Sequence, residues 1–228
     1  MQINSDFTQR VVLNTVDMPW VASPSGGVER RMLDRVAAEH GRATSLVRYA
    51  PGAAFPEHAH PGGEEALVLS GTFSDASGDH PAGSYLRNPP GSRHAPYSDE
   101  GCVMLVKLHQ FAPDDLGTTR LDTRQATWLP GLVPGLSVLP LHTFGTEHTA
   151  LVRWAAGTRF NRHRHWGGEE IFVLEGTFQD EHGRYLAGSW LRSPHLSEHT
   201  PFSVEGCVIY VKTGHLDAVR LELAGVGR

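Results

Sequence analysis

"GAAFPEHAHPGGEEALVLSG", residues 52–71, recurs as "GTRFNRHRHWGGEEIFVLEG" at residues 157–176, without a gap and at an offset of 105 residues. The same offset relates "GSYLRNPPGSRH" (83–94) to "GSWLRSPHLSEH" (188–199), and near the start of each half it becomes 108. The chain is therefore an internal duplication, and both halves should share one structure.

Each half is predicted to consist of short β-strands joined by glycine turns. Residues 28–42 alone resemble an amphipathic helix, but their counterpart at 136–148 has Pro140 in mid-segment, which a helix does not tolerate. We therefore expect strand, turn and strand in both copies. Further strands are predicted at 45–50, 65–75, 83–87, 102–109 and their copies. This pattern is typical of a β-sandwich or barrel, used twice.

The composition excludes several classes of protein. The 228 residues carry a net charge of −5 and show no basic stripe, which argues against nucleic acid or an anionic membrane as a partner. No apolar run reaches transmembrane length and the N-terminus lacks an apolar signal core, so we expect a cytoplasmic protein. Cys102 and Cys207, in apolar runs, should be buried reduced thiols, which leaves no disulfide scaffold and no cysteine zinc finger.

Histidines and glutamates of the repeat have the spacing of a metal site. Side chains two residues apart in a strand point to one face, so His58 and His60 should project together, with Glu64 in phase and Glu65 facing the other way. Imidazoles and a carboxylate can hold a divalent ion. A proline-bounded turn could return His94 to the same interior. The predicted ligands are His58, His60, Glu64 and His94 in the first half and His163, His165, Glu169 and His199 in the second.

The pattern G-x5-H-x-H-x3-E-x6-G followed by G-x5-P-x-G-x2-H resembles the double motif of the cupin superfamily. Residues 52–71 and 83–94 match every position, and the second copy matches except that Leu196 replaces the second glycine. The resemblance implies an all-β fold of two tandem jelly-roll cupin barrels, residues 1–112 and 113–228, with residues 110–125 as the connection. It also implies one metal in each barrel, held by three histidines and one glutamate.

Within the superfamily, the residue pattern "GGEE…V-L-x-G-x-F-x-D" is most similar to the cupin-like domain of ChrR-type anti-sigma factors. In that family a small helical zinc-binding domain precedes the cupin and grips an extracytoplasmic-function sigma factor. The sequence departs from this pattern: about 40 residues precede the first motif strand, and they hold no cysteine for such a zinc site. This departure weakens the expectation of a sigma factor as partner.

Three functions are compatible with the sequence. The resemblance favours a sensing or regulatory module without turnover. Because some cupins use the same ligands, the alternative is a non-haem metal-dependent dioxygenase acting on a small carbonyl or phenolic compound bound in the barrel. A purely structural role for the metal ranks third. Zinc is the favoured metal, with iron, manganese and nickel as alternatives. A monomer and a homodimer are both compatible with the sequence.

Some repeated residues near the ligands are candidates for the barrel walls, or else for core or surface positions. They are Phe55/Phe160, Arg48/Arg153, Tyr85/Trp190, Arg87/Arg192 and Tyr97/Phe202.

Overall fold

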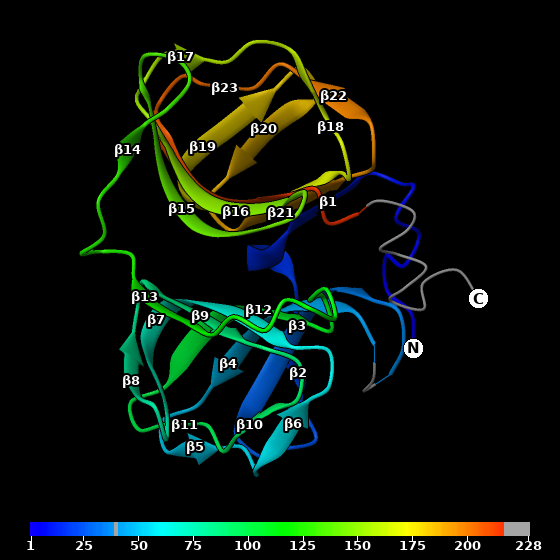
Figure 1. The fold of residues 1–228 in the computed structure, drawn as a ribbon, viewed down its shortest axis with the longest axis vertical. Helices are drawn as coiled ribbons and strands as arrows, with labels where there is room; N and C mark the ends of the chain where they lie inside the picture. The colour runs from blue at the N-terminus through cyan, green and yellow to red at the C-terminus, as the bar shows by residue number, and fades with distance from the viewer. Residues whose placement is uncertain (39–40, 217–228) are drawn as a thin grey trace.

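Two β-barrels lie one above the other along the long axis of the molecule (Figure 1). The computed structural model describes residues 1–38 and 41–216. Within them the only helical element is a single 3-10 turn, η1 (Thr15–Asp17). The predicted all-β fold of two jelly-roll barrels is confirmed, and residues 28–35 form a strand rather than a helix.

The N-terminal barrel has one large and one small sheet plus a separate two-stranded ribbon. Its large sheet has the order β13-β9-β7-β12-β4-β3-β2, and β6 pairs with β10 in the ribbon. The strands are β2 (Val21–Ala22), β3 (Val28–Arg35), β4 (Ala43–Tyr49), β5 (Ala53–Ala54), β6 (His58–His60), β7 (Glu64–Asp75), β8 (Gly78–Pro81), β9 (Ser84–Asn88), β10 (Ser92–His94), β11 (Tyr97–Ser98), β12 (Cys102–Leu108) and β13 (Thr119–Asp122).

The C-terminal barrel repeats this plan, with a large sheet of order β1-β21-β19-β24-β16-β15-β14 and the ribbon β18–β22. Its strands are β1 (Val11–Asn14), β14 (Leu129–Pro130), β15 (Leu136–Phe144), β16 (Glu147–Trp154), β17 (Thr158–Arg159), β18 (His163–His165), β19 (Glu169–Asp180), β20 (Gly183–Leu186), β21 (Ser189–Ser193), β22 (Ser197–His199), β23 (Phe202–Ser203) and β24 (Cys207–Thr213).

The last glycine of the first motif lets one strand serve both sheets of its barrel. Strand β7 pairs with β12 up to Gly71 and with β8 beyond it. Gly71 has a φ of 69°, and a Cβ there would collide with the carbonyl oxygen of Gly101. Gly176 has the same φ in β19 and the equivalent close approach to Gly206. Only glycine satisfies both conditions at this bend.

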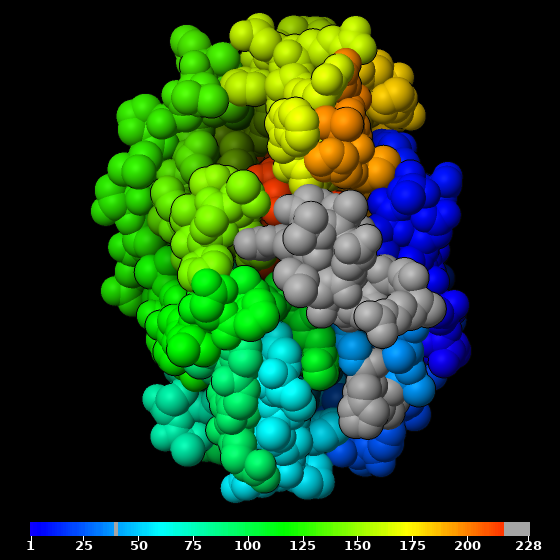
Figure 2. Space-filling view, turned by 45° about the vertical axis from the view of Figure 1, so that its right-hand side comes forward, coloured from blue at the N-terminus to red at the C-terminus, as the bar shows by residue number. Residues whose placement is uncertain are grey.

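Each barrel receives one edge strand from the other half of the chain. Strand β1 pairs antiparallel with β21 of the C-terminal barrel, and β13 pairs antiparallel with β9 of the N-terminal barrel. The two exchanged strands occupy equivalent positions of the duplication, at the offset of 108. Figure 2 shows the blue N-terminal segment lying against the orange C-terminal half. The segment that connects the halves therefore also supplies strand β13 to the large sheet of the N-terminal barrel.

The large sheets of the two barrels face each other across a buried interface. Strand β7 is buried on both faces: Ala66 and Val68 lie in the core of their own barrel, whereas Leu67 packs between the barrels. The interface cluster also contains Tyr85 and Trp190, which precludes either from lining a metal cavity. Its other buried members are Leu33, Leu46, Leu105, Leu139, Leu141, Leu151, Phe172 and Tyr210.

The second glutamate of each GGEE run pairs with a lysine of the other barrel. Glu65 accepts a hydrogen bond from Lys212 at 2.6 Å, and Glu170 accepts one from Lys107 at 2.5 Å. These are the two lysines of the whole chain, and both are buried. Arg87 also donates to Glu65, at 2.9 Å, within the N-terminal barrel. Because side chains alternate along β7 and β19, the predicted opposite orientation of the paired glutamates is confirmed.

No helix in residues 1–38 and 41–216 is long and apolar enough to cross a membrane. Cys102 and Cys207 are buried free thiols, and burial raises the pKa of the Cys207 thiol to about 11. These cysteines therefore belong to the cores of their barrels.

Candidate metal centres

A short two-stranded ribbon brings the histidines of each half together. In the pairing of β6 with β10, His58 lies opposite His94 and His60 lies opposite Ser92. In the pairing of β18 with β22, His163 lies opposite His199. The H-x-H spacing puts two rings on one face of the first strand, and the last residue of the second strand adds the third.

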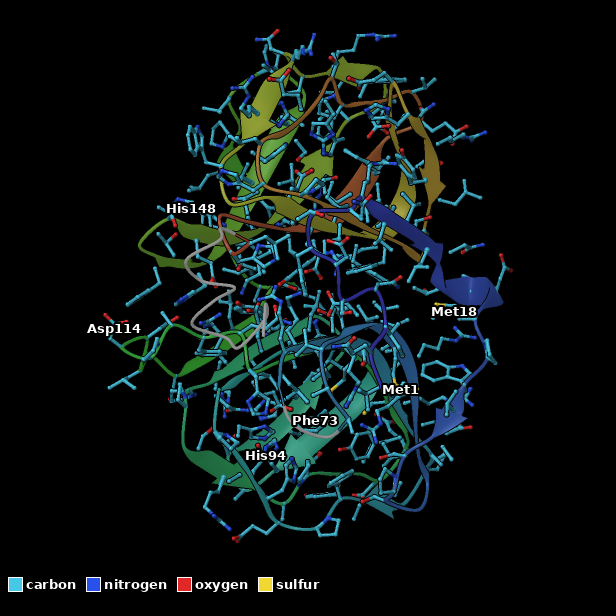
Figure 3. The ribbon with its side chains drawn as sticks, turned by 90° about the vertical axis from the view of Figure 1, so that its right-hand side faces the viewer. Met1, Met18, Phe73, His94, Asp114 and His148 are labelled. Carbon is cyan, nitrogen blue, oxygen red and sulfur yellow. The ribbon has the colours of Figure 1, made fainter. Side chains whose placement is uncertain are left out.

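In the N-terminal barrel the three predicted histidines form one group whose ligand atoms all lie within 4.8 Å of one another. Glu64 adjoins this group: its Oε2 atom is 3.5 Å from His60 Nε2 and 3.6 Å from His94 Nε2. His94 projects into the lower barrel in Figure 3, close to Phe73.

In the C-terminal barrel all four predicted residues, His163, His165, Glu169 and His199, form one group within the same 4.8 Å. The Glu169 carboxylate oxygens lie 3.6 Å from His165 Nε2 and 3.6 Å from His199 Nε2. The structure thus brings together every predicted residue of this half, with the glutamate inside the 4.8 Å group, whereas Glu64 lies next to its group in the other half.

The nitrogen atoms approach one another as ligands of a single ion would. His60 Nε2 lies 3.0 Å from His94 Nε2, and His165 Nε2 lies 3.1 Å from His199 Nε2. Two nitrogens at about 2.1 Å from one ion and at right angles would be about 3.0 Å apart. The donor set fits a divalent transition metal, because neutral imidazole and carboxylate are ligands of zinc, iron, manganese and nickel.

Backbone and carboxylate acceptors orient the rings. His58 Nδ1 lies 2.8 Å from the carbonyl oxygen of Pro56, and His94 Nδ1 lies 3.0 Å from Asp75 Oδ2. His163 Nδ1 has an equivalent carbonyl acceptor at 2.9 Å. An acceptor at Nδ1 holds the proton there and leaves the lone pair of Nε2 facing the centre of the group. Histidine ligands in proteins are commonly supported in this way.

The carboxylates of the two centres differ in their surroundings. Burial would raise the pKa of Glu64, but His60, His94 and a 2.9 Å hydrogen bond from Asn88 together lower it. Burial raises the pKa of Glu169 to about 7. Ser193 stands opposite Glu169 where Asn88 stands opposite Glu64. The N-terminal barrel therefore stabilises its carboxylate anion before any cation is bound.

Burial and neighbouring groups shift the pKa values of the ligand histidines. Burial lowers the pKa of His60, and it lowers the pKa of His165 to about 3, so both rings are neutral at neutral pH. For His94, burial opposes the hydrogen bond to Asp75 and the nearby Glu64, and the pKa is raised. His199 has a raised pKa for the same reasons, with Asp180 and Glu169 as its neighbours.

A cavity of about 290 Å³ lies beside the N-terminal group. The three histidines and Glu64 line it together with Arg30, Tyr49 and Phe55. Phe55 is the one member of the predicted wall pairs that lines this cavity. Its volume suits a small molecule near the lower end of the usual range.

Phe160, the counterpart of Phe55, lies beside His163 in the C-terminal barrel, with ring centroids 5.0 Å apart. The predicted arginines lie away from the cavity. Arg87 and Arg192 are fully buried, bonded to Glu65 and Asp34 respectively, on the face of the sheet opposite the cavity. Arg48 and Arg153 lie over the rings of Trp20 and Trp128. The prediction failed for these residues because repetition by itself does not say which face of a strand a residue occupies.

Several residues around the ligands were missed by the sequence reasoning. Asp75 and Asp180 support His94 and His199, and their recurrence at the offset of 105 was a signal for them. Asn88 has no such signal, because its counterpart is Ser193. Arg120, which donates to Asn88, lies in the segment expected to be only a linker.

The ChrR cupin-like domain model matches the chain twice, over residues 8–112 and 117–217. The chain belongs to the ChrR cupin-like domain family. Both halves of this family member carry the ligand groups described above. The curated proteins give no match.

Solved structures of similar fold include a candidate dioxygenase from Nostoc punctiforme, with a TM-score of 0.75 and 16% identity over 90% of this chain and 82% of that one. YlbA from E. coli has a TM-score of 0.71 and 15% identity, over 93% and 94%. The oxalate decarboxylase of Lactobacillus farciminis has a TM-score of 0.66 and 14% identity, over 95% and 90%. At these identities the likeness establishes a shared bicupin fold.

Proposed function

We propose that each barrel binds one divalent metal ion through three histidines and one glutamate, and that the N-terminal barrel is a metal-dependent dioxygenase for a small carbonyl or phenolic compound. The metal, when bound, supplies an open coordination position for Lewis-acid chemistry or oxygen activation. Iron suits this function because it is redox-active, as zinc is not.

The cavity beside His58, His60 and His94 carries the proposal, because a purely structural metal needs no space next to it. Phe55 and Tyr49 offer aromatic surfaces for a planar substrate. Arg30 is a basic group on the same wall and suits an acidic enol or phenol oxygen. The volume of about 290 Å³ limits the substrate to a small molecule.

The test is reconstitution of the full chain with Fe(II) without oxygen, followed by oxygen-uptake measurements with β-diketones and hydroxyphenyl ketones. We expect uptake that depends on both iron and substrate in the wild type and in the His165→Ala variant, but not in His60→Ala. Stoichiometric iron binding without uptake on any member of this panel would contradict the dioxygenase.

A sensing role is the second candidate, and the observation that favours it is membership of the ChrR cupin-like family in both halves. In that case the barrels hold zinc, and a ligand of the N-terminal cavity alters stability without turnover. Co-purification of an extracytoplasmic-function sigma factor with the zinc form, and its release by the ligand, would support this candidate over the dioxygenase.

A further inference from the structure

The metal centre of the N-terminal barrel is connected to a strand that follows the barrel in the sequence. Arg120 lies on the edge strand β13, which pairs with β9. Its guanidinium group donates from Nη2 to Asn88 Oδ1 at 2.6 Å, and from Nε to Ser77 Oγ at 3.3 Å. A third contact, from Nη1 to the carbonyl oxygen of Arg87 at 3.0 Å, holds the group against β9.

One branch of this network reaches the glutamate of the centre. Asn88 donates from Nδ2 to Glu64 Oε2 at 2.9 Å. The orientation of the Asn88 amide follows from chemistry, because a guanidinium can only donate and a carboxylate only accepts. Arg120 therefore fixes the amide, and the amide fixes Glu64 Oε2, the oxygen nearest His60 and His94.

The other branch reaches a histidine. The Ser77 hydroxyl accepts from Arg120 and donates to Asp75 Oδ1, and the backbone N–H of Ser77 donates to the same oxygen at 2.7 Å. Asp75 Oδ2 lies 3.0 Å from His94 Nδ1. Two of the four predicted ligands are thus supported by one side chain from outside the motifs.

The C-terminal barrel has a different and smaller arrangement. The residue of β1 that corresponds to Arg120 of β13 is Val12. Arg10, just before β1, donates to Tyr185 OH at 2.6 Å, and its Nη2 lies 3.6 Å from Asp180 Oδ2. Asp180 lies 3.5 Å from His199. This arginine, also from the exchanged segment, supports one ligand rather than two.

We propose that Arg120 is a positioning residue for the N-terminal metal centre, so that docking of the exchanged strand β13 sets the metal affinity of that barrel. The inference rests on the proposed metal site. Arg120 pre-orients Glu64 through Asn88 and His94 through Ser77 and Asp75. The cation consequently finds two of its ligands already in place.

The experiment uses the full chain in a His165→Ala/His199→Ala background, which leaves only the N-terminal centre. Cobalt(II) affinity is measured by chelator competition, and the cobalt absorption spectrum and the metal-free melting temperature are recorded. We expect Arg120→Ala to weaken cobalt binding by about tenfold, the lower end of the loss caused by removing a direct partner of a ligand, because Arg120 acts through Asn88 and Ser77. Arg124→Ala is the matched control, because Arg124 bonds only to the nearby Asp122 in the described residues.

A second variant covers the case in which Arg120→Ala does not fold. Asn88→Ser copies Ser193 of the other barrel, interrupts the branch to Glu64 and should also weaken cobalt binding. Arg120→Lys replaces the several donor nitrogens of the guanidinium by one ammonium group. It should therefore keep only part of the cobalt affinity of the background protein.

The outcomes separate the two proposals. Unchanged cobalt affinity in both Arg120→Ala and Asn88→Ser would overturn the positioning role. An equal loss in Arg124→Ala would overturn it as well. If the background protein itself binds no cobalt, the metal site has failed, and with it the proposed function.

Discussion

The two barrels carry the same four ligand types, yet their centres are built differently. In the N-terminal barrel Asn88 bonds to the glutamate, a glycine forms the turn before His94, and a cavity lies beside the histidines. In the C-terminal barrel a serine replaces Asn88, Leu196 occupies the turn, and Trp154 replaces Tyr49 of the cavity wall. The ligands determine which metal ions can bind, whereas the surrounding residues determine whether a small molecule has space beside the bound metal.

The largest effect should come from removing one ligand in each barrel. His60→Ala should remove one of two metal equivalents, His165→Ala the other, and the double variant both, because each ring is buried at the centre of its group. Metal content of the purified protein is the measurement. His148→Ala, at an exposed histidine, is the control. Two equivalents in the double variant would disprove the ligand sets.

The two buried lysines at the interface should also differ in how much they stabilise the protein. Lys107→Met removes the lysine bonded to Glu170 and leaves the neutral Trp190 and His215 as its hydrogen-bond partners among the described residues, at a cost of about 3–5 kcal/mol in the free energy of unfolding. Lys212→Met should cost more, because Lys212 pairs with both Glu65 and Glu147, and the variant leaves these two buried carboxylates to Arg87. Chemical denaturation measures both. Because these are the chain's two lysines, amine labelling should follow the opening of the interface. A smaller loss in Lys212→Met than in Lys107→Met would contradict the double pairing of Lys212.

Acid should destabilise the fold through Glu147, a buried carboxyl of the C-terminal barrel. Burial would raise the pKa of this carboxyl, but Lys212 at 2.6 Å outweighs it and lowers the pKa to about 2. A pKa below the ordinary 4.5 means that the stabilisation is complete above pH 4.5 and is lost as the pH falls towards 2. The loss should be about 3 kcal/mol. Melting temperatures of the wild type and Glu147→Gln from pH 6 to 2 test this, and parallel curves would contradict it.

The difference in cavity walls can be tested by exchange. Tyr49→Trp copies Trp154 into the N-terminal barrel and should weaken binding of a small ligand about tenfold, because the larger ring occupies cavity space. Metal content should not change. Calorimetry with a substrate identified by oxygen uptake gives the affinity, and Trp154→Tyr should leave that affinity unaltered. Full ligand affinity in Tyr49→Trp would place the ligand elsewhere.

The smallest effect concerns the turn before the last histidine. Gly91 has a φ of 85°, and Leu196 keeps the left-handed conformation with a φ of 66°. An added Cβ at Gly91 would meet nothing within 4 Å, so Gly91→Ala should cost about 1 kcal/mol from the backbone alone. Leu196→Gly should stabilise slightly, since the strain relieved exceeds the entropy lost. Thermal unfolding measures both, and a neutral Gly91→Ala would show that the turn relaxes.

The sequence by itself determined the duplication, the all-β class and the four candidate ligands of each half. Histidine spacing and a strand's period of two are local properties, so His58, His60 and Glu64 could be assigned to one face and Glu65 to the other. The proline in one copy corrected the helical appearance of the other. Such inferences need only neighbours within a few residues and a second copy for comparison.

Contacts between residues that are distant in the chain could be identified only from the tertiary structure. The exchange of β1 and β13, the pairing of Lys107 and Lys212 with the opposite barrel and the support of Glu64 by Asn88 and Arg120 join residues that are distant in the chain. Their partners depend on how the sheets are stacked, and the packing of two complete surfaces sets that stacking. A local spacing cannot encode it.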